Sequence, residues 1–337
     1  MHVPDGFLDA STSLATGAIA VGAVGLCLRR AEREIAETGP ALAGLTAAFV
    51  FGGQMVNFPV GAGTSGHLIG AALAAALVGP WTAVVCVTVV LLVQALLVAD
   101  GGLTALGTNI TLRAVVGVTV SYLVMRAVLR VLPRRERSVV PAAAIGALVS
   151  VPASALAFTA LYAVGGAVAI PIGTLAGAMV GWHLVIGVGE AVITGAVLAA
   201  VLASRPDLVY LARHSTIAAP DGGRLPARPG RRVLVAGGLV TLVVAGVVSL
   251  AASSSPDGLE FVSEALGFGE AGQASATAGS PLADYGVAGI PNAALAAGLA
   301  GVIGVVLTLL VGVTASRLAS RTVADAVPDD ELVPSGR

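Results

Sequence analysis

The sequence predicts an all-α membrane protein with about nine transmembrane segments and its N-terminus outside the cell. Of the 337 residues, 56% are hydrophobic and only 11% are charged, whereas a soluble domain carries about 25% charged residues. Apolar runs of about 20 residues, long enough to cross a bilayer as helices, recur from end to end. Gly and Ala are abundant, which favours close helix packing, and the alternating segments of about 10 residues typical of a β-barrel are missing.

Nine apolar stretches are the expected helices, and the third of them is short. It follows the Gly-rich sequence GAGTSG. We therefore expect a half-helix after a re-entrant loop, which is tolerated only where protein surrounds it. The nine stretches are 11–28, 41–58, 67–79, 81–99, 107–131, 139–163, 177–203, 233–252 and 290–315.

The positions of the arginines predict the orientation. Arginines follow the first, fifth and ninth stretches and fill the connection between the seventh and eighth, while the connections 59–66, 100–106, 164–176 and 253–289 contain none. Because cytoplasmic loops carry the excess of positive charge, this pattern places the uncleaved N-terminus outside the plasma membrane of a prokaryote.

A change in composition predicts the domain organisation. Residues 204–232 are rich in Pro, Gly and Arg, which is typical of a cytoplasmic linker. The linker separates a seven-span module (1–203) from a two-span module with an outside loop (233–315), and 316–337 form a cytoplasmic tail. Within the outside loop, 269–281 are expected to be flexible. The small-residue runs GAALAAALVG and GVIGVV are expected to offer sliding surfaces to partner subunits.

The composition also excludes several functions. All 18 basic residues are Arg, and a phosphate-binding P-loop needs a Lys, so ATP hydrolysis would have to come from another subunit. The net charge of −1 gives no indication of nucleic-acid binding. Cys27 and Cys86 lie in separate apolar runs and form neither a CxxC metal motif nor a disulfide framework.

The first two residues form a potential metal chelator. The Met1 amine, the His2 amide and His2 Nδ1 offer three nitrogens in one plane, and a fourth nitrogen would complete a square. Square-planar nitrogen sites suit Ni(II) or Cu(II), and less often Co(II), whereas Zn(II) prefers a tetrahedron. Of the other histidines, His214 lies on the cytoplasmic side, while His67 begins the short third segment near the outer face and is the candidate for the fourth donor.

At these residues the sequence resembles a known family. The stretches MHVPDGFLD, FVFGGQMVNFPVGAGTSGHLIG, LLVADGGLTALGTNITLRAVVG and GWHLVIGVGEAVITG are similar to the substrate-capture (S) components of the cobalt/nickel energy-coupling-factor transporters, the CbiM/NikM family. The later stretch SSSPDGLEFV resembles the PDGLE domain, an accessory membrane module of such proteins. The match covers nearly all of residues 1–203.

The resemblance implies a function and a set of partners. Met1, His2 and His67 would hold Ni²⁺ or Co²⁺ for an ATP-driven importer, with no cofactor beyond the transported ion and no enzymatic activity. A transmembrane coupling subunit and two cytoplasmic ATPases would supply the driving force, in the lipid bilayer and without nucleic acid.

Other polar residues near the outer end are candidates for hydrogen bonds to the ligands or to the tail. Gln54 and Asn57 are spaced i, i+3 and are expected to share a helical face. The remaining candidates are Ser65, Asp100 and Asn109. Arg113 lies inside the fifth stretch and is expected to pair with Asp100 or Glu190.

Two alternatives for the whole protein remain open at this point. A proton-coupled secondary transporter would use Glu190, Asp100 and His183. An intramembrane enzyme would place its site at His183 and Glu190, although no catalytic motif accompanies them.

The second Pro-Asp-Gly turn, at 256–258, repeats the turn at 4–6. It is either a plain turn, or a site where Asp257 and Glu260 collect cations, or the point at which the hairpin docks on the tail.

Overall fold

The computed structural model describes residues 1–133, 135–215 and 229–324. The predicted class is confirmed, because within these residues seven helices are long and apolar enough to cross a membrane. Each overlaps an expected stretch, although the first runs ten residues past the end of 11–28. These spans are Ala10–Thr38 (α1), Pro80–Val98 (α4 and a π-helical turn), Leu106–Val131 (α5, a π-helical segment and α6), Glu136–Gly165 (mostly α7), Ile172–Ser204 (α8), Arg231–Ala251 (mostly α10) and Ala293–Ser320 (most of α12).

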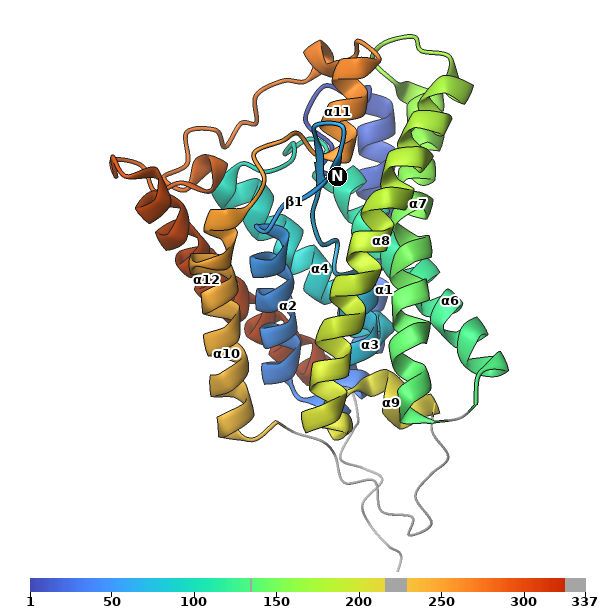
Figure 1. Cartoon of the computed structure of the whole chain (residues 1–337), viewed down its shortest axis with the longest axis vertical. Helices are drawn as coiled ribbons and strands as arrows, with labels where there is room; N and C mark the ends of the chain where they lie inside the picture. Colours follow the sequence, from blue (N-terminus) through green and yellow to red (C-terminus); the bar gives the residue numbers. More distant parts are fainter. Residues whose placement is uncertain (134, 216–228, 325–337) are drawn as a thin grey trace, which may run out of the picture.

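The expected count of nine is not confirmed, because the second and third stretches form shorter helices. Helix α2 (Pro40–Gln54) has 15 residues and α3 (Ala71–Val78) has eight. Between them the chain forms an antiparallel hairpin of β1 (Phe58–Gly61) and β2 (Thr64–Gly66). As Figure 1 shows, α2 rises from the end of the bundle opposite the N-terminus. Helix α3 runs back toward that end. Because α2 and α3 together return the chain to the side from which α2 began, the predicted orientation of the other helices is unchanged.

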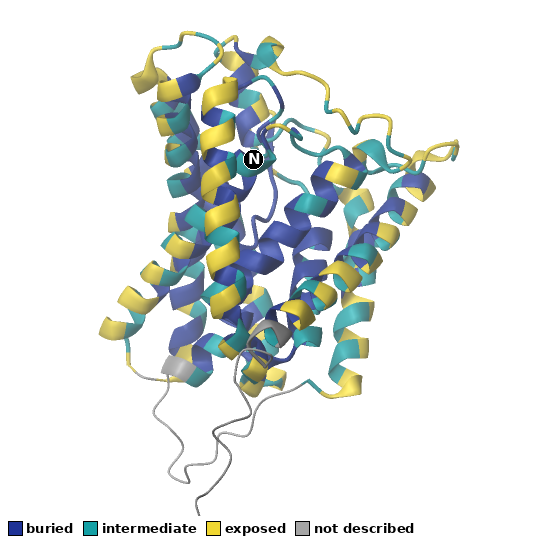
Figure 2. Cartoon of the chain, turned by 180° about the vertical axis from the view of Figure 1, so that it is seen from behind, coloured by how far each residue is buried: buried dark blue, intermediate teal, exposed yellow. Residues whose placement is uncertain are grey.

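Helix α3 is enclosed by the rest of the protein. Every residue of α3 is buried, as Figure 2 shows for the centre of the molecule. The surrounding helices include α4 (Pro80–Val93), α6 (Gly117–Val131) and α7 (Val139–Gly165). The expectation that GAALAAALVG offers a sliding surface is therefore wrong, because its side chains already fill the core.

The two helices of the C-terminal module pack against the N-terminal module through small residues. Helix α12 (Ala293–Ala324) lies against α2 and α1, and α10 (Arg231–Gly246) lies against α2. Gly312 lies against Gly44 and Gly304 against Phe51, both in α2, while Gly301 lies against the Ala245 carbonyl of α10 within the C-terminal module. The GVIGVV run thus has its glycines inside the protein, because close approach of two helices requires residues without a large side chain. It is not a free sliding surface.

Several expectations concern the linker and the tail. The proposed linker (204–232) contains the short helix α9 (Tyr210–Ser215), whereas 216–228 lie outside the described residues. The same holds for 325–337 in the proposed cytoplasmic tail. In the outer loop, 269–281 were expected to be flexible, yet they are hydrogen-bonded to the π-helical turn that follows α4. Thr277 Oγ1 donates to the Ala95 carbonyl (2.6 Å) and Ser280 Oγ to the Leu97 carbonyl (2.5 Å).

Candidate metal centre

The N-terminal tail runs into the outer end of the bundle as an ordered strand of chain. The backbone of Val3 is held on both sides by Asn109, whose Oδ1 accepts from Val3 N (2.8 Å) and whose Nδ2 donates to Val3 O (2.9 Å). Gly102 N also donates to Val3 O (2.9 Å). Because each backbone group is satisfied, the tail remains fixed while burying the side chain of Val3, which is fully inaccessible.

Asp5 anchors the tail two residues further along. Its buried carboxylate accepts from Leu103 N (3.1 Å), from Thr104 N and Oγ1 (2.7 and 2.5 Å) and from Ala105 N (3.2 Å). These donors directly precede α5 (Leu106–Asn109), so Asp5 satisfies backbone N–H groups at the start of that helix from a distant part of the chain.

The tail brings the Met1 amine against His67. The amine nitrogen lies 2.7 Å from His67 Nε2, and His67 Nδ1 donates to the Leu68 carbonyl at 3.1 Å. Because the second ring nitrogen carries the proton, the lone pair of Nε2 points toward the amine. The second contact of the amine is Asp257 Oδ2, at 3.0 Å, which also lies 3.7 Å from His67 Nε2.

His2 lies beside this pair and stacks on the His67 ring with 5.2 Å between ring centroids. Its Nε2 contacts Nη1 of Arg113 and lies 3.1 Å from Gln94 Oε1. Its Nδ1 donates to Asp100 Oδ1 at 3.1 Å, because a carboxylate oxygen only accepts. Ligand atoms of His2, His67 and Asp257 all lie within 4.8 Å of one another, which is close enough for one metal ion to reach all three.

A layer of hydrogen bonds fixes the groups around His2. Gln94 Nε2 donates to Gln54 Oε1 (2.7 Å) and to the Tyr285 hydroxyl (3.0 Å), and that hydroxyl donates to Asp100 Oδ2 (2.5 Å). Gln94 begins one π-helical turn (Gln94–Val98), and Arg113 lies in a second π-helical segment (Ile110–Val116). Such segments often occur at functional sites, and here both of them direct a polar side chain toward His2.

The loop that carries His67 is held by hydrogen bonds to three other parts of the chain: α8, α2 and the outer loop. Glu190 of α8 (Ile172–Ser204) accepts from Ile69 N and Gly70 N, both at 2.9 Å, and Gln54 Nε2 donates to the Ile69 carbonyl at 2.9 Å. On the other side, Ser65 Oγ donates to the Ser255 carbonyl at 2.7 Å. Glu190 and Ser65 therefore position the ligand-bearing loop without touching His67 itself.

Two expectations about polar residues are wrong. Asn57 does not share a helical face with Gln54, because α2 ends at Gln54 and the β-hairpin follows. Asn57 instead accepts from Ser253 N through its backbone carbonyl (2.8 Å). Within the described residues Arg113 forms no ion pair with Asp100 or Glu190; its Nη1 contacts His2, and its Nε and Nη2 have no hydrogen-bond partner.

Burial controls the protonation of the tail and its ligands. Burial lowers the pKa of the Met1 amine, with the Asp257 carboxylate opposing the shift. Burial and the neighbouring amine lower the pKa of His67 to about 4. Burial raises the pKa of Asp257, but the Met1 amine and His67 outweigh it and hold this pKa well below its usual range. At neutral pH, the imidazole of His67 is consequently neutral and able to bind a metal.

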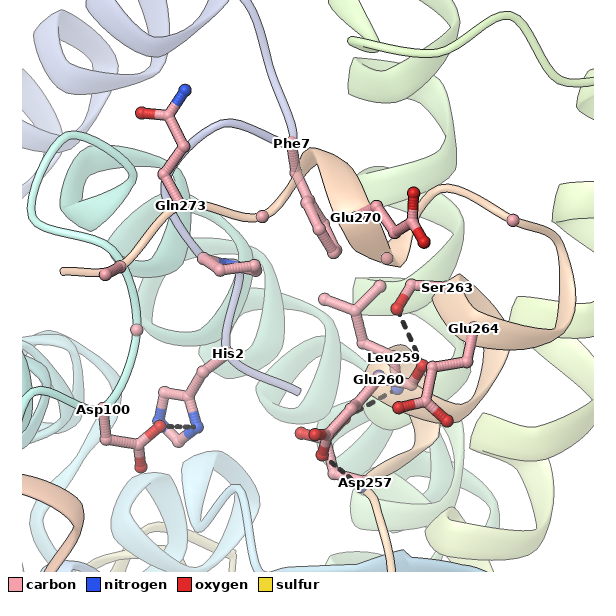
Figure 3. Close-up of a pocket in the computed structure, with 16 residues that line it drawn as sticks. His2, Phe7, Asp100, Asp257, Leu259, Glu260, Ser263, Glu264, Glu270 and Gln273 are labelled. Carbon is pink, nitrogen blue, oxygen red and sulfur yellow. Dashed lines mark hydrogen bonds and ion pairs between the residues drawn. The ribbon is translucent and has the colours of Figure 1, made fainter.

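A cavity of about 960 Å³ connects this cluster to the outer surface. Figure 3 shows His2 and Asp100 on one side of the cavity and Asp257, Glu260, Glu264 and Glu270 on the other. Apart from His2, no basic residue is among the described residues that line it. Several carboxylates around one cavity attract divalent cations to its floor.

Three of the contacting residues were not among the predicted site residues. Asp257 was predicted to lie in a plain turn, to collect cations, or to belong to a turn that docks on the tail, and it does contact the tail at the Met1 amine; Gln94 and Tyr285 were not predicted. The single amide in the apolar stretch 81–99 was the available signal for Gln94, because a polar residue inside a membrane helix is costly and usually has a partner.

The fold and this cluster define a multi-pass membrane protein with a candidate transition-metal site at one end of its helical bundle. Comparison with known proteins gives the family. Residues 2–208 match the CbiM family model, described as a cobalt uptake substrate-specific transmembrane region, and residues 231–321 match the PDGLE domain. The chain therefore belongs to the CbiM family and carries a PDGLE domain, and the family is a metal-transporter component rather than an enzyme.

Relatives and solved structures agree with this assignment. The fused nickel transport protein NikMN of Rhodobacter capsulatus is 32% identical over 91% of this chain and 94% of its own length. The cobalt transport protein CbiM of Sorangium cellulosum is 35% identical over 62% of this chain and 94% of its own length. A crystal structure of a transition metal transporter is 31% identical, with a TM-score of 0.54, and covers 64% of this chain and 98% of its own.

Proposed function

We propose that this protein is the substrate-capture component of an ATP-driven importer of the energy-coupling-factor type, and that it binds Ni²⁺ or Co²⁺ in a square-planar nitrogen site. The observation that carries the proposal is the 2.7 Å approach of the Met1 amine to His67 Nε2, with the His2 ring stacked beside them. Two parts of the chain separated by 66 positions thus meet as potential ligands.

The four donors are the Met1 amine, the His2 amide, His2 Nδ1 and His67 Nε2. The first three close a five-membered and a six-membered ring on an ion, which keeps them in one plane. Planar nitrogen donors suit Ni(II) and Co(II) better than Zn(II). Binding requires His2 Nδ1 to release Asp100 and requires the amine and the amide to lose protons. Because the tail is already ordered, little conformational free energy is lost on binding.

Partners must provide the energy for transport. The chain contains no Lys and so no P-loop, which supports the division of labour in which a transmembrane coupling subunit and two cytoplasmic ATPases act with it in the bilayer. The contacts of Glu190 favour this function over a proton-coupled carrier, because both of its carboxylate oxygens accept backbone N–H groups. His183 Nδ1 likewise donates within its own helix, to the Met179 carbonyl.

The binding site is tested by His2→Gln. The Gln side chain is large enough for Met1 to be retained, but this change removes the imidazole from the fused rings, so we expect the nickel bound by the purified protein to fall from about one ion per chain to a trace. The matched control is His214→Gln, which replaces a histidine far from the tail in sequence and should bind like the wild type. Wild-type binding by His2→Gln would rule out the chelate.

The energy source is tested separately by uptake of radioactive nickel into cells. We expect uptake to require the ATPase subunits and to survive a protonophore as long as ATP is maintained. Uptake that continues without the ATPases and stops with the protonophore would instead identify a proton-coupled carrier.

A further inference from the structure

Successive residues of the PDGLE sequence contact the elements around the metal centre, and these contacts hold the C-terminal module against it. The Pro256 carbonyl accepts from Ser65 N at 2.8 Å, next to the His67 loop. Gly258 lies so close to α8 that a Cβ atom there would be 2.6 Å from Ile186 Cδ1. Leu259 is buried, and Glu260 accepts from Asp257 N (3.3 Å) as part of a capping box at the start of α11 (Gly258–Ala265).

The two oxygens of Asp257 have different partners. Oδ1 caps α11 by accepting from Leu259 N (2.8 Å) and Glu260 N (3.0 Å). Oδ2 points away from that helix, toward the Met1 amine and His67 Nε2, at 3.0 and 3.7 Å. The cap therefore fixes one oxygen in place, while the other remains directed at two proposed nitrogen ligands.

Asp257 also lies where two cavities adjoin. Its side chain is 18% exposed and lines both the cavity of about 960 Å³ and a second cavity of about 440 Å³, as do His2 and Glu260, whereas His67 lines only the second cavity. An ion that enters through the first cavity, past the exposed carboxylates of Glu264 and Glu270, thus reaches Asp257 Oδ2 before it reaches His67 Nε2.

We propose, building on the function proposed above, that Asp257 is the carboxylate ligand that receives the hydrated ion and passes it to the nitrogen site. A Ni²⁺ or Co²⁺ ion in water has oxygen ligands, and one of its waters can exchange for Oδ2 while the amine and amide still carry their protons. The nitrogens then replace the oxygens as those protons leave. The PDGLE module accordingly supplies a ligand from a separate part of the chain and controls the rate of loading.

Asp257→Asn tests this assignment. The Asn side chain retains an oxygen for capping α11 but removes the anionic ligand. We expect loading of the purified protein by Ni²⁺, followed by stopped-flow absorption, to slow about tenfold, with the final stoichiometry and spectrum unchanged. Glu264→Gln is the matched control, because it removes one charge from the same cavity without contacting the centre; its loading rate should stay within about twofold of the wild type.

A second variant guards against loss of the PDGLE fold. Asp257→Ser preserves a good helix cap and lacks the carboxylate, so it should slow loading to the same extent. The opposite role for Asp257 is to hold the amine as an ammonium group and so compete with the ion. In that case both variants would load as fast as the wild type or faster, and the proposal would be overturned.

The result also separates this inference from the proposed function. If the wild-type protein with a free Met1 amine binds no Ni²⁺, the nitrogen site itself is wrong. If the wild type binds Ni²⁺ and both Asp257 variants load normally, the nitrogen site stands and only the role of Asp257 is lost.

Discussion

The two Pro-Asp-Gly turns have the same sequence and different surroundings. In the turn at 4–6, both oxygens of the Asp5 carboxylate accept hydrogen bonds, from Leu103, Thr104 and Ala105. In the turn at 256–258, Asp257 uses one oxygen for its helix cap and directs the other at the Met1 amine. The tripeptide therefore specifies a turn and a capping carboxylate, and the environment decides whether an oxygen is left for a cation.

This difference assigns separate tasks to the two turns. Asp5 fixes the position of the tail and should govern how tightly the ion is held at equilibrium. Asp257 borders the open cavity and should govern how quickly the ion arrives. The following changes test that separation, beginning with the largest expected effect.

Asp5→Ala should have the largest effect. It leaves several backbone N–H groups before α5 without their acceptor, at a cost of about 1–3 kcal/mol for each buried donor, so the ordered tail should be released. We expect the affinity for Ni²⁺, measured by competition with a chelator, to fall about 100-fold. If Asp5→Ala slowed loading and left the equilibrium affinity intact, the two turns would not have separate tasks.

Acidification should weaken binding by about tenfold or more for each pH unit. The His2 amide must release its proton at every pH, which gives a slope of about one in a plot of log affinity against pH. Burial lowers the pKa of the Met1 amine. Only at a pH below this lowered pKa does the amine carry a proton that metal binding must release, so the slope should rise to about two there. A slope that falls to zero near pH 8 would exclude a deprotonated amide from the site.

Acid should also loosen the empty tail. The pKa of His67 is about 4 in the folded protein and about 6.5 in an unfolded chain, so the unfolded chain binds more protons between these values. The stability that arises from the neutral His67 is fully present above pH 6.5 and is lost as the pH falls toward 4. Proteolysis of the tail between pH 7 and 4.5 should therefore accelerate, and His67→Gln should reduce this dependence.

Glu190→Gln should weaken binding about tenfold, as is typical for a residue that positions a ligand. A Gln side chain offers one acceptor oxygen, so Ile69 N or Gly70 N loses its partner and the His67 loop becomes less fixed. Nickel affinity at constant pH is the measurement, and Glu264→Gln serves as the matched control. A change in loading rate alone would place Glu190 on the pathway of the ion instead.

Tyr285→Phe should have the smallest effect. The hydroxyl donates to Asp100 and accepts from Gln94, and loss of such bonds costs about 1 kcal/mol, or about fivefold in affinity. An effect as large as that of Asp5→Ala would show that Asp100 determines the position of His2 more strongly than the tail does.

Much of the fold could be predicted from the sequence, because membrane helices have a strong compositional signal. The order of the long helices follows from apolar length and the positions of Arg. The number of spans could not be obtained in this way, because an apolar run such as 41–58 does not show where its helix stops. Helix α2 ends at Gln54 and a β-hairpin follows, a boundary set by tertiary contacts around Ser65 and Ser253.

The site was predictable only in part. Met1 and His2 are adjacent, so their chelating geometry is a local property of the chain, and the resemblance indicated His67. The contact of Met1 with Asp257 joins residues 256 positions apart and has no local signal. Asp257 was nevertheless noticeable because its turn repeats that of Asp5. Gln94 and Tyr285 depend on how α4 and the outer loop meet, which periodicity does not specify.

The most direct test of the account is X-ray absorption at the nickel edge of the loaded protein, prepared with its native Met1 amine free. We expect four nitrogen donors in a plane with two imidazoles, and one imidazole fewer in His67→Ala. A six-coordinate shell rich in oxygen, or an imidazole signal that does not change in His67→Ala, would contradict it.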